Sequence, residues 1–140
     1  MRSEIRNITA SIEAILEQHG FVPVEEFSDV NYLDYSGIMF AFISFEGSTV
    51  VAEALPYRSD DFCLETDHKL CLHLYGRAED FSDNSQHMEA CYEVFYDIVA
   101  NPYLPVCKIE LSKAVQSMPL RRLERRIELT VRTLEKAEVE

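Results

Sequence analysis

The sequence predicts an α+β fold, with three amphipathic helices packed on an antiparallel sheet in the order α-β-β-β-β-α-β-α. Two observations carry this prediction: three segments repeat apolar residues at helical spacing, and the strand-like segments cluster between the first two of them. No repeat, linker or change of composition divides the 140 residues. We therefore expect one domain spanning 1–140.

The first helix is predicted to begin at Ser3, whose hydroxyl can cap it, and to end at Gly20. Gly20 stands where a left-handed residue commonly ends a helix. The apolar residues recur every three or four positions, which places them on one stripe: Ile5, Ile8, Ile12, Ile15 and Leu16.

The next part of the chain has strand character. Phe21–Phe27 and Val30–Tyr35 are short extended segments. Ile38–Phe45 is apolar on both of its faces, as in a central strand that is covered on each side. Glu46–Ser48 is read as a turn, after which Thr49–Leu55 returns as the hairpin partner.

A further strand, Lys69–Tyr75, alternates in a regular way. The alternation sends three leucines to one face and three reactive or polar side chains to the other, namely Cys71, His73 and Tyr75.

The second half of the chain ends with a helix, a strand and a helix. The second helix is predicted over 86–100, with a buried stripe that comprises Met88, Cys91, Tyr92, Phe95, Ile98 and Val99. Val106–Ser112 follows as a strand with Cys107 inward. The last helix begins at Ser117 and Pro119, and its apolar seam is Leu120, Leu123, Ile127, Val131 and Leu134.

The charge of the chain excludes some partners. Its 25 acidic and 13 basic residues give a net charge of −12, which repels phosphate backbones, so we expect no nucleic-acid partner. No apolar run is long enough to span a bilayer, and the N-terminus lacks the features of a secretory signal. We expect a cytoplasmic protein without a membrane partner, whose four cysteines are reduced thiols.

The cysteines and histidines form the most suggestive group. Cys71 and His73 share a strand face, and His87 and Cys91 stand one helical turn apart, both of which suit zinc ligation. A wider set adds Cys63 and His68. The alternative is that the thiols pack as small apolar groups, and we prefer it because the spacing matches no zinc-knuckle pattern. We expect no metal or cofactor; any metal would be held by Cys71, His73, His87 and Cys91.

The sequence contains no recognisable catalytic motif. A phosphate-binding loop, a dinucleotide-binding glycine pattern, a nucleophile elbow and a zinc-protease motif are all missing from it. A Cys–His pair using Cys63 or Cys91 is conceivable, but nothing activates one thiol over another. Acidic clusters such as Glu25-Glu26 and Asp60-Asp61 read as solvated surface. We therefore expect a protein that is not an enzyme.

Binding residues are expected among the aromatic and arginine side chains. Tyrosines near strand ends are common interface residues, and arginines on the last helix could hold phosphate or an anionic partner, or pair with Glu124 and Glu128. The candidates for a partner surface are Tyr32, Tyr35, Phe45, Tyr75, Arg121 and Arg125.

The order of these elements resembles that of the YbjN-type family of bacterial sensory transduction regulators. The resemblance rests on the helix ending in His19-Gly20-Phe21, the aromatic segment Tyr32–Leu55 and the stretch Val94–Pro105, in which a helix runs into a strand through an Asn. It implies a fold similar to class I type III secretion chaperones, no catalytic residues, and a small, often dimeric protein that binds other polypeptides. The chain departs from the family in that only one strand, Val106–Val115, is evident where a strand pair is usual.

These observations favour a non-catalytic, chaperone-like or regulatory module that binds another polypeptide through a sheet edge or a groove, and that forms a homodimer. One alternative is an acidic inhibitor or immunity-type protein that neutralises a basic partner. A second alternative is a small zinc protein or enzyme built on the Cys/His group.

Overall fold

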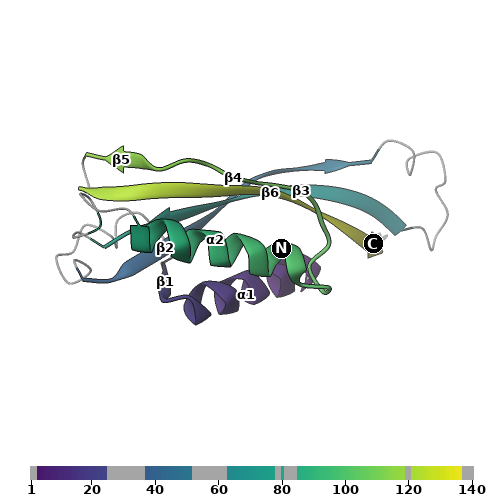
Figure 1. The fold of residues 1–140 in the computed structure, drawn as a ribbon. Helices are drawn as coiled ribbons and strands as arrows, with labels where there is room; N and C mark the ends of the chain where they lie inside the picture. The colour runs from purple at the N-terminus through teal and green to yellow at the C-terminus, as the bar shows by residue number, and fades with distance from the viewer. Residues whose placement is uncertain are drawn as a thin grey trace.

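The structure is a computed structural model, which describes residues 3–24, 37–51, 63–77, 80, 85–118 and 121–136. Two helices lie side by side against one face of a mixed sheet of six strands, so the fold is α+β (Figure 1). No helix in these ranges is both long enough and apolar enough to cross a membrane.

The described elements follow one another as helix, three strands, helix, three strands. Their bounds are α1 Ser3–Gln18, β1 Phe21–Val24, β2 Met39–Val50, β3 Cys63–Tyr75, α2 Ser85–Ala100, β4 Val106–Leu111, β5 Val115–Ser117 and β6 Arg122–Lys136.

The sheet has the order β1-β2-β3-β6-β4, and β5 also pairs with β6. The short edge strand β1 runs parallel to β2, whereas all other pairings are antiparallel. The longest pairing joins β3 to β6 along the whole of β3, from Cys63 opposite Lys136 to Tyr75 opposite Glu124. This pair forms the centre of the sheet.

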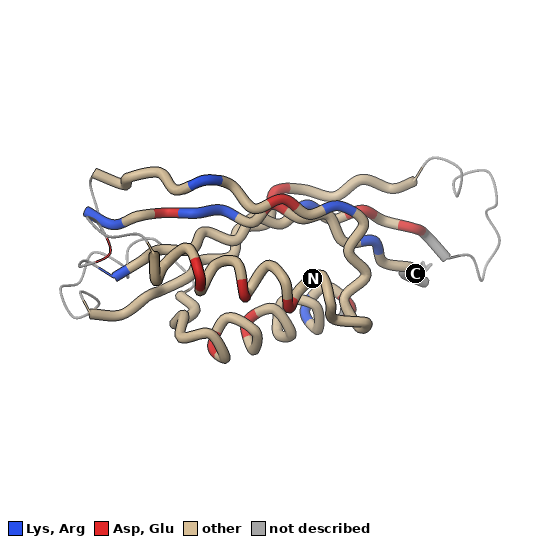
Figure 2. The backbone as a smooth tube through the Cα atoms, viewed as in Figure 1, with Lys and Arg blue, Asp and Glu red and all other residues tan. Residues whose placement is uncertain are grey.

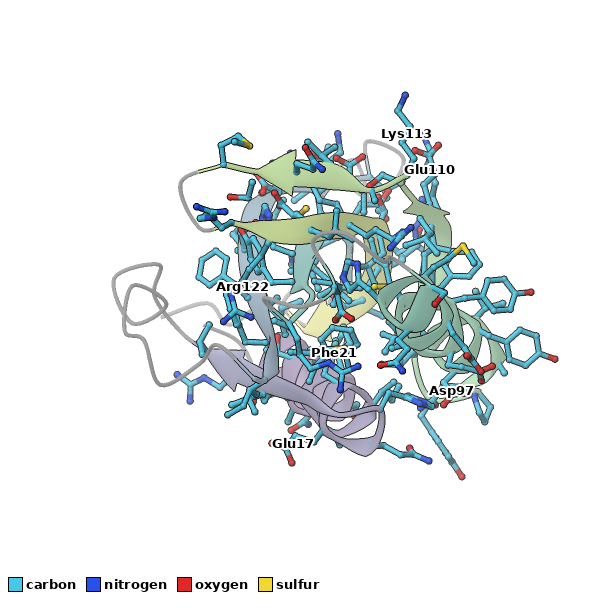
Figure 3. All side chains as sticks on the ribbon, turned by 60° about the vertical axis from the view of Figure 1, so that its left-hand side comes forward. Glu17, Phe21, Asp97, Glu110, Lys113 and Arg122 are labelled. Carbon is cyan, nitrogen blue, oxygen red and sulfur yellow. The ribbon has the colours of Figure 1, made fainter. Side chains whose placement is uncertain are left out.

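The core lies between the helices and the facing side of the sheet. The apolar stripe of α1 is buried there as predicted, and the three leucines of β3 meet it from the sheet. Phe21, which follows Gly20 at φ +87°, lies inside the molecule between the two layers (Figure 3). We call the opposite side of the sheet, turned away from α1 and α2, the outer face.

Several predictions are confirmed. Both helices before Pro102 form within a residue or two of the predicted ends, and strand character is correct in 21–24, 39–45, 69–75 and 106–111. The alternation predicted for β3 is also correct, because Leu70, Leu72 and Leu74 belong to the core.

The last predicted helix is wrong, because residues 122–136 form the strand β6. The predicted hairpin of Thr49–Leu55 is wrong too: Thr49 and Val50 continue β2, and Glu46–Ser48 is not a turn but part of an irregular pairing inside that strand. The strand proposed for Val30–Tyr35 lies outside the described residues. The sheet is therefore mixed, not a meander, and the described chain has two helices.

Two buried stripes also differ from their predictions. On α2 the buried residues are His87, Cys91, Val94 and Ile98, whereas Met88, Tyr92 and Val99 are exposed. On β4, the pairing with β6 shifts between Val106 and Lys108, so Cys107 at this irregularity is exposed instead of inward.

The strand assignment of 122–136 predicts an unequal cost for shortening two of its apolar residues. Ile127 is fully buried, so Ile127→Ala leaves a cavity at the centre of the sheet and should lower the free energy of unfolding by about 2–5 kcal/mol. Leu134 is 62% exposed, and Leu134→Ala should cost about 0.5 kcal/mol or less. Urea unfolding of both variants measures the difference. A helix with these residues in one seam would give similar costs for both, which would contradict the strand.

Candidate functional site

A polar cluster lies in the middle of the outer face, on the three adjacent strands β2, β3 and β6. Sheet register places it there: Ser44 is opposite Cys71, and His73 lies between Phe42 and Arg126. Because side chains alternate between faces, Cys71 and His73 point away from the leucines that fill the core. The chain thus brings a thiol, an imidazole and a hydroxyl onto one patch.

Hydrogen bonds fix the imidazole of His73 from both sides. Its Nδ1 lies 2.8 Å from Oε2 of Glu124, and its Nε2 lies 3.2 Å from Oγ of Ser44. The hydroxyl of Ser44 in turn donates to Oε1 of Glu46 at 2.6 Å. Arg126 donates from Nε to the same Glu124 oxygen at 2.9 Å. The result is a connected network across three strands.

The network changes the acidity of its members. Hydrogen bonds with Cys71 and Glu124 raise the pKa of His73 to about 9, against the lowering effect of burial. For Glu124, burial raises the pKa, but hydrogen bonds from His73 and Arg126 outweigh it and hold the value below normal. The imidazole of His73 is therefore protonated at neutral pH.

The arrangement Ser44–His73–Glu124 has the order of a hydrolase triad, but its protonation does not favour that chemistry. A general base must accept the serine proton, whereas His73 already holds a proton on each ring nitrogen at neutral pH. The Ser44 hydroxyl donates to Glu46, not to the imidazole. Ser44 is better described as a connector between His73 and Glu46.

Three of these side chains present potential metal ligands to a common point. One ligand atom from each of Glu46, Cys71 and His73 lies within 4.8 Å of the other two. The same residues line a cavity of about 430 Å³, together with Lys69, Lys108, Arg126, Glu110 and Glu128. Glu110 points outward on the side of the sheet opposite the helices (Figure 3).

The four predicted metal residues do not meet. Cys71 and His73 are in the outer-face cluster, whereas His87 and Cys91 extend from α2 into the opposite side of the sheet, where Cys91 belongs to the core. Of the wider set, His68 is buried between Ser48 and Thr133, and the side chain of Cys63 lies outside what the structure describes.

His87 has its own buried environment. Its Nε2–H donates to the carbonyl oxygen of Leu74 at 3.0 Å, and its Nδ1 accepts from Nη1 of Arg125 at 2.8 Å. Burial lowers the pKa of His87 to about 4; the charge of Arg125 also lowers it, and the hydrogen bond to Leu74 and the charge of Asp80 only partly offset them. His87 is thus a neutral structural residue that orients Arg125.

The residues predicted for a partner surface differ in how exposed they are in the structure. Tyr75 is 2% exposed and stacks on Phe40, and Arg125 is buried against His87, so both predictions of a surface role are wrong. Phe45 is half exposed and lines a groove of about 310 Å³ beside α1. Arg121 is exposed at φ +53°. Tyr32 and Tyr35 lie outside the described residues.

The arginines that were predicted to lie together on a last helix are divided between the two faces of the sheet by the strand. Alternation sends Arg125 to the core side, while Arg122 and Arg126 belong to the outer face. Arg122 is buried and donates from Nη1 to the carbonyl oxygens of Ile38 and Gly76. Arg126 pairs with Glu124 two residues away, not at helical spacing.

A second candidate surface is an apolar stripe on the outward side of α2 and the turn after it. Its members are Met88, Tyr92, Tyr96, Val99 and Tyr103, which are 52%, 55%, 55%, 53% and 88% exposed. They recur at intervals of three or four residues, so they form one continuous line. We call this line the α2 stripe.

Sequence reasoning missed Glu46, Ser44 and Glu124 as members of the outer-face cluster. One signal was present: a glycine inside an apolar strand, as at Gly47, can mark a bulge in a continuing strand, and a strand that continues sends Ser44 and Glu46 to one face. For Glu124 the signal was hidden, because a helical reading of 117–136 places it on a solvated face.

No protein-family model matches the chain, and a search of curated proteins finds no significant match.

The buried state of His87 predicts a stability that depends on pH. In the unfolded chain the imidazole takes up a proton below about pH 6.5, whereas in the folded chain it resists protonation until about pH 4. The stabilising contribution is therefore complete above about pH 6.5 and is lost as the pH falls toward 4, by about 3 kcal/mol in total. Urea unfolding at several pH values in this window measures the loss.

The control is His87→Gln, which keeps an N–H donor for Leu74 but cannot titrate. The variant should be less stable at neutral pH, and its stability should fall less steeply on acidification than that of the wild type. Parallel curves for the two proteins would contradict the buried neutral state of His87.

Proposed function

We propose that the chain is a non-catalytic protein-binding module, and that its partner is a basic amphipathic helix lying along the α2 stripe. The observation that carries the proposal is the exposure of an apolar line that contains two tyrosines on a surface helix and a third in the turn after it. Tyrosine is enriched where interfaces concentrate their binding energy. An apolar line at intervals of three and four residues suits an amphipathic helix that packs along it.

The charge beside the stripe favours a basic partner. Helix α2 contains no Lys or Arg, and Figure 2 shows acidic residues along it. Glu89 and Glu93 are exposed next to the stripe, and Asp97 is paired with His19 of α1. Lysines or arginines that flank the apolar face of a partner would meet these carboxylates.

A second copy of the chain fits the stripe less well. Two α2 stripes packed together would bring Glu89 and Glu93 of both copies close to one another, and like charges at an interface are destabilising. The predicted homodimer thus stays a prediction for some other surface, and a cytoplasmic location likewise stays a prediction.

The resemblance to the YbjN-type family and to type III secretion chaperones remains part of this proposal. The part of the chain that agrees with it is the order α1-β1-β2-β3-α2-β4. The chain departs from that pattern where a last helix is expected and β6 is found.

The stripe is tested with a synthetic helical peptide that carries leucines on one face and lysines on the other, and with a matched peptide in which glutamate replaces lysine. The wild type should bind the lysine peptide and should bind the glutamate peptide at least about 10-fold more weakly. Fluorescence anisotropy at low and moderate salt measures both affinities.

The variants change the apolar stripe without changing charge. Tyr92→Ser with Tyr96→Ser should weaken binding of the lysine peptide by about 10-fold or more. The control, Val115→Ser, removes an equally exposed apolar side chain on β5 and should leave the affinity unchanged. Equal binding by the double variant contradicts the proposal. Light scattering that shows a dimer dissociated by the double variant would instead assign the stripe to self-association.

A further inference from the structure

The geometry points to a zinc-binding site on the outer face of the sheet, in which Glu46, Cys71 and His73 are the ligands. This site differs from the α2 stripe, and it differs from the predicted set because His87 and Cys91 take no part in it.

The donor atoms suit zinc. Zn²⁺ binds thiolate sulfur, imidazole nitrogen and carboxylate oxygen, commonly in a tetrahedral arrangement. Its bond lengths of about 2.0–2.3 Å place neighbouring ligand atoms about 3.5 Å apart. In the chain the three atoms lie within 4.8 Å of one another, so small side-chain movements close the site. Glu46 is exposed and has the freedom to make most of that movement.

The groups around the ligands orient them as in known zinc sites. A zinc-binding histidine usually donates its other ring N–H to a carboxylate, which fixes the ring. His73 makes this bond from Nδ1 to Glu124, which leaves Nε2, 3.2 Å from Oγ of Ser44, as the nitrogen that would bind zinc in place of its proton. Arg126 holds Glu124 in place, and Ser44 holds Glu46. The supporting bonds therefore exist before any metal binds.

The backbone of β2 is irregular at Glu46, the third ligand. Phe45 pairs with Leu70 and Gly47 pairs with Lys69, so Glu46 is an extra residue without a register partner. Glu46 nevertheless lies on the outer face, because it follows Ser44 by two residues and side chains alternate, and its carboxylate accepts the Ser44 hydroxyl. Gly47 has φ +134°, a conformation that residues with a side chain rarely adopt. The glycine is what allows the bulge.

The site has room for a further ligand. The three side chains lie at the wall of the 430 Å³ cavity, so a fourth tetrahedral position faces solvent. Glu128, which is opposite Cys71 in the register, lines the same cavity. Water or this carboxylate would complete the coordination. Without metal, the same residues form only the hydrogen-bonded network described above.

The direct test uses the full chain after treatment with a chelator. Cobalt(II) replaces zinc in such sites and gives a thiolate-to-metal absorption band in the near ultraviolet. We expect one equivalent of cobalt to produce this band, and zinc to displace the cobalt stoichiometrically. A wild-type chain that takes up no equivalent of either metal overturns the proposal.

Matched variants assign the ligands. Cys71→Ser should abolish the thiolate band, whereas Cys107→Ser, which removes an exposed thiol outside the cluster, should leave it unchanged. Glu124→Gln should weaken zinc binding by about 10- to 100-fold, because it loosens His73 without removing a ligand. Calorimetric zinc titration measures these affinities.

Glu46→Gln keeps the test valid if Cys71→Ser folds poorly, because Glu46 is exposed and its loss leaves the core intact. We expect this variant to weaken zinc binding by at least about 10-fold. Zinc binding as tight as that of the wild type would contradict the ligand set, as would loss of the thiolate band in Cys107→Ser.

Discussion

The antiparallel pairing of β3 with β6 is the constraint on which the rest of the structure depends. Along this pair, alternate residues go to opposite faces, so two long strands create two chemically different surfaces. On one side, leucines and Ile127 complete the core beneath the helices. On the other, Cys71, His73 and Glu124 form a polar cluster. A slip of one residue would exchange these sets, and the cost of burying the polar set fixes the register.

The same pair of strands shifts the pKa values of two histidines in opposite directions. His87 is held between the Leu74 carbonyl and Arg125; burial and a cationic neighbour lower its pKa to about 4. His73 lies on the other face, where Cys71 and Glu124 raise its pKa to about 9. Neither value follows from residue type or sequence spacing. Both follow from the face to which β6 directs an arginine or a glutamate, namely Arg125 inward and Glu124 outward.

The strand β6 also explains the main failure of prediction from sequence. Leu123, Ile127 and Val131 are spaced by four, which fits a helical stripe and one face of a strand equally well. Leu129 fits only the strand pattern. Arg125 interrupts that pattern, because a charged residue stands where the alternation requires an apolar one. Its buried partner, His87, comes from a distant helix, so the sequence around Arg125 does not show that it is buried. The helix α1 and the alternation of β3 were predictable because their patterns are local. The cluster was only half predictable from sequence, because the residues around Glu46 were predicted to form a turn and those around Glu124 a helix.

Helix α2 shows why apolar pattern alone does not identify a buried side. Its apolar residues surround much of the helix, and the predicted stripe mixed buried positions, Cys91 and Ile98, with exposed ones, Met88, Tyr92 and Val99. The side that meets the core also includes Val94 and His87, which the apolar pattern did not select. A surface helix that is apolar on both sides has more apolar area than its own fold can cover. Since the α2 stripe and the Glu46–Cys71–His73 cluster lie on different sides of the molecule, a helix bound to the former leaves the latter open to solvent.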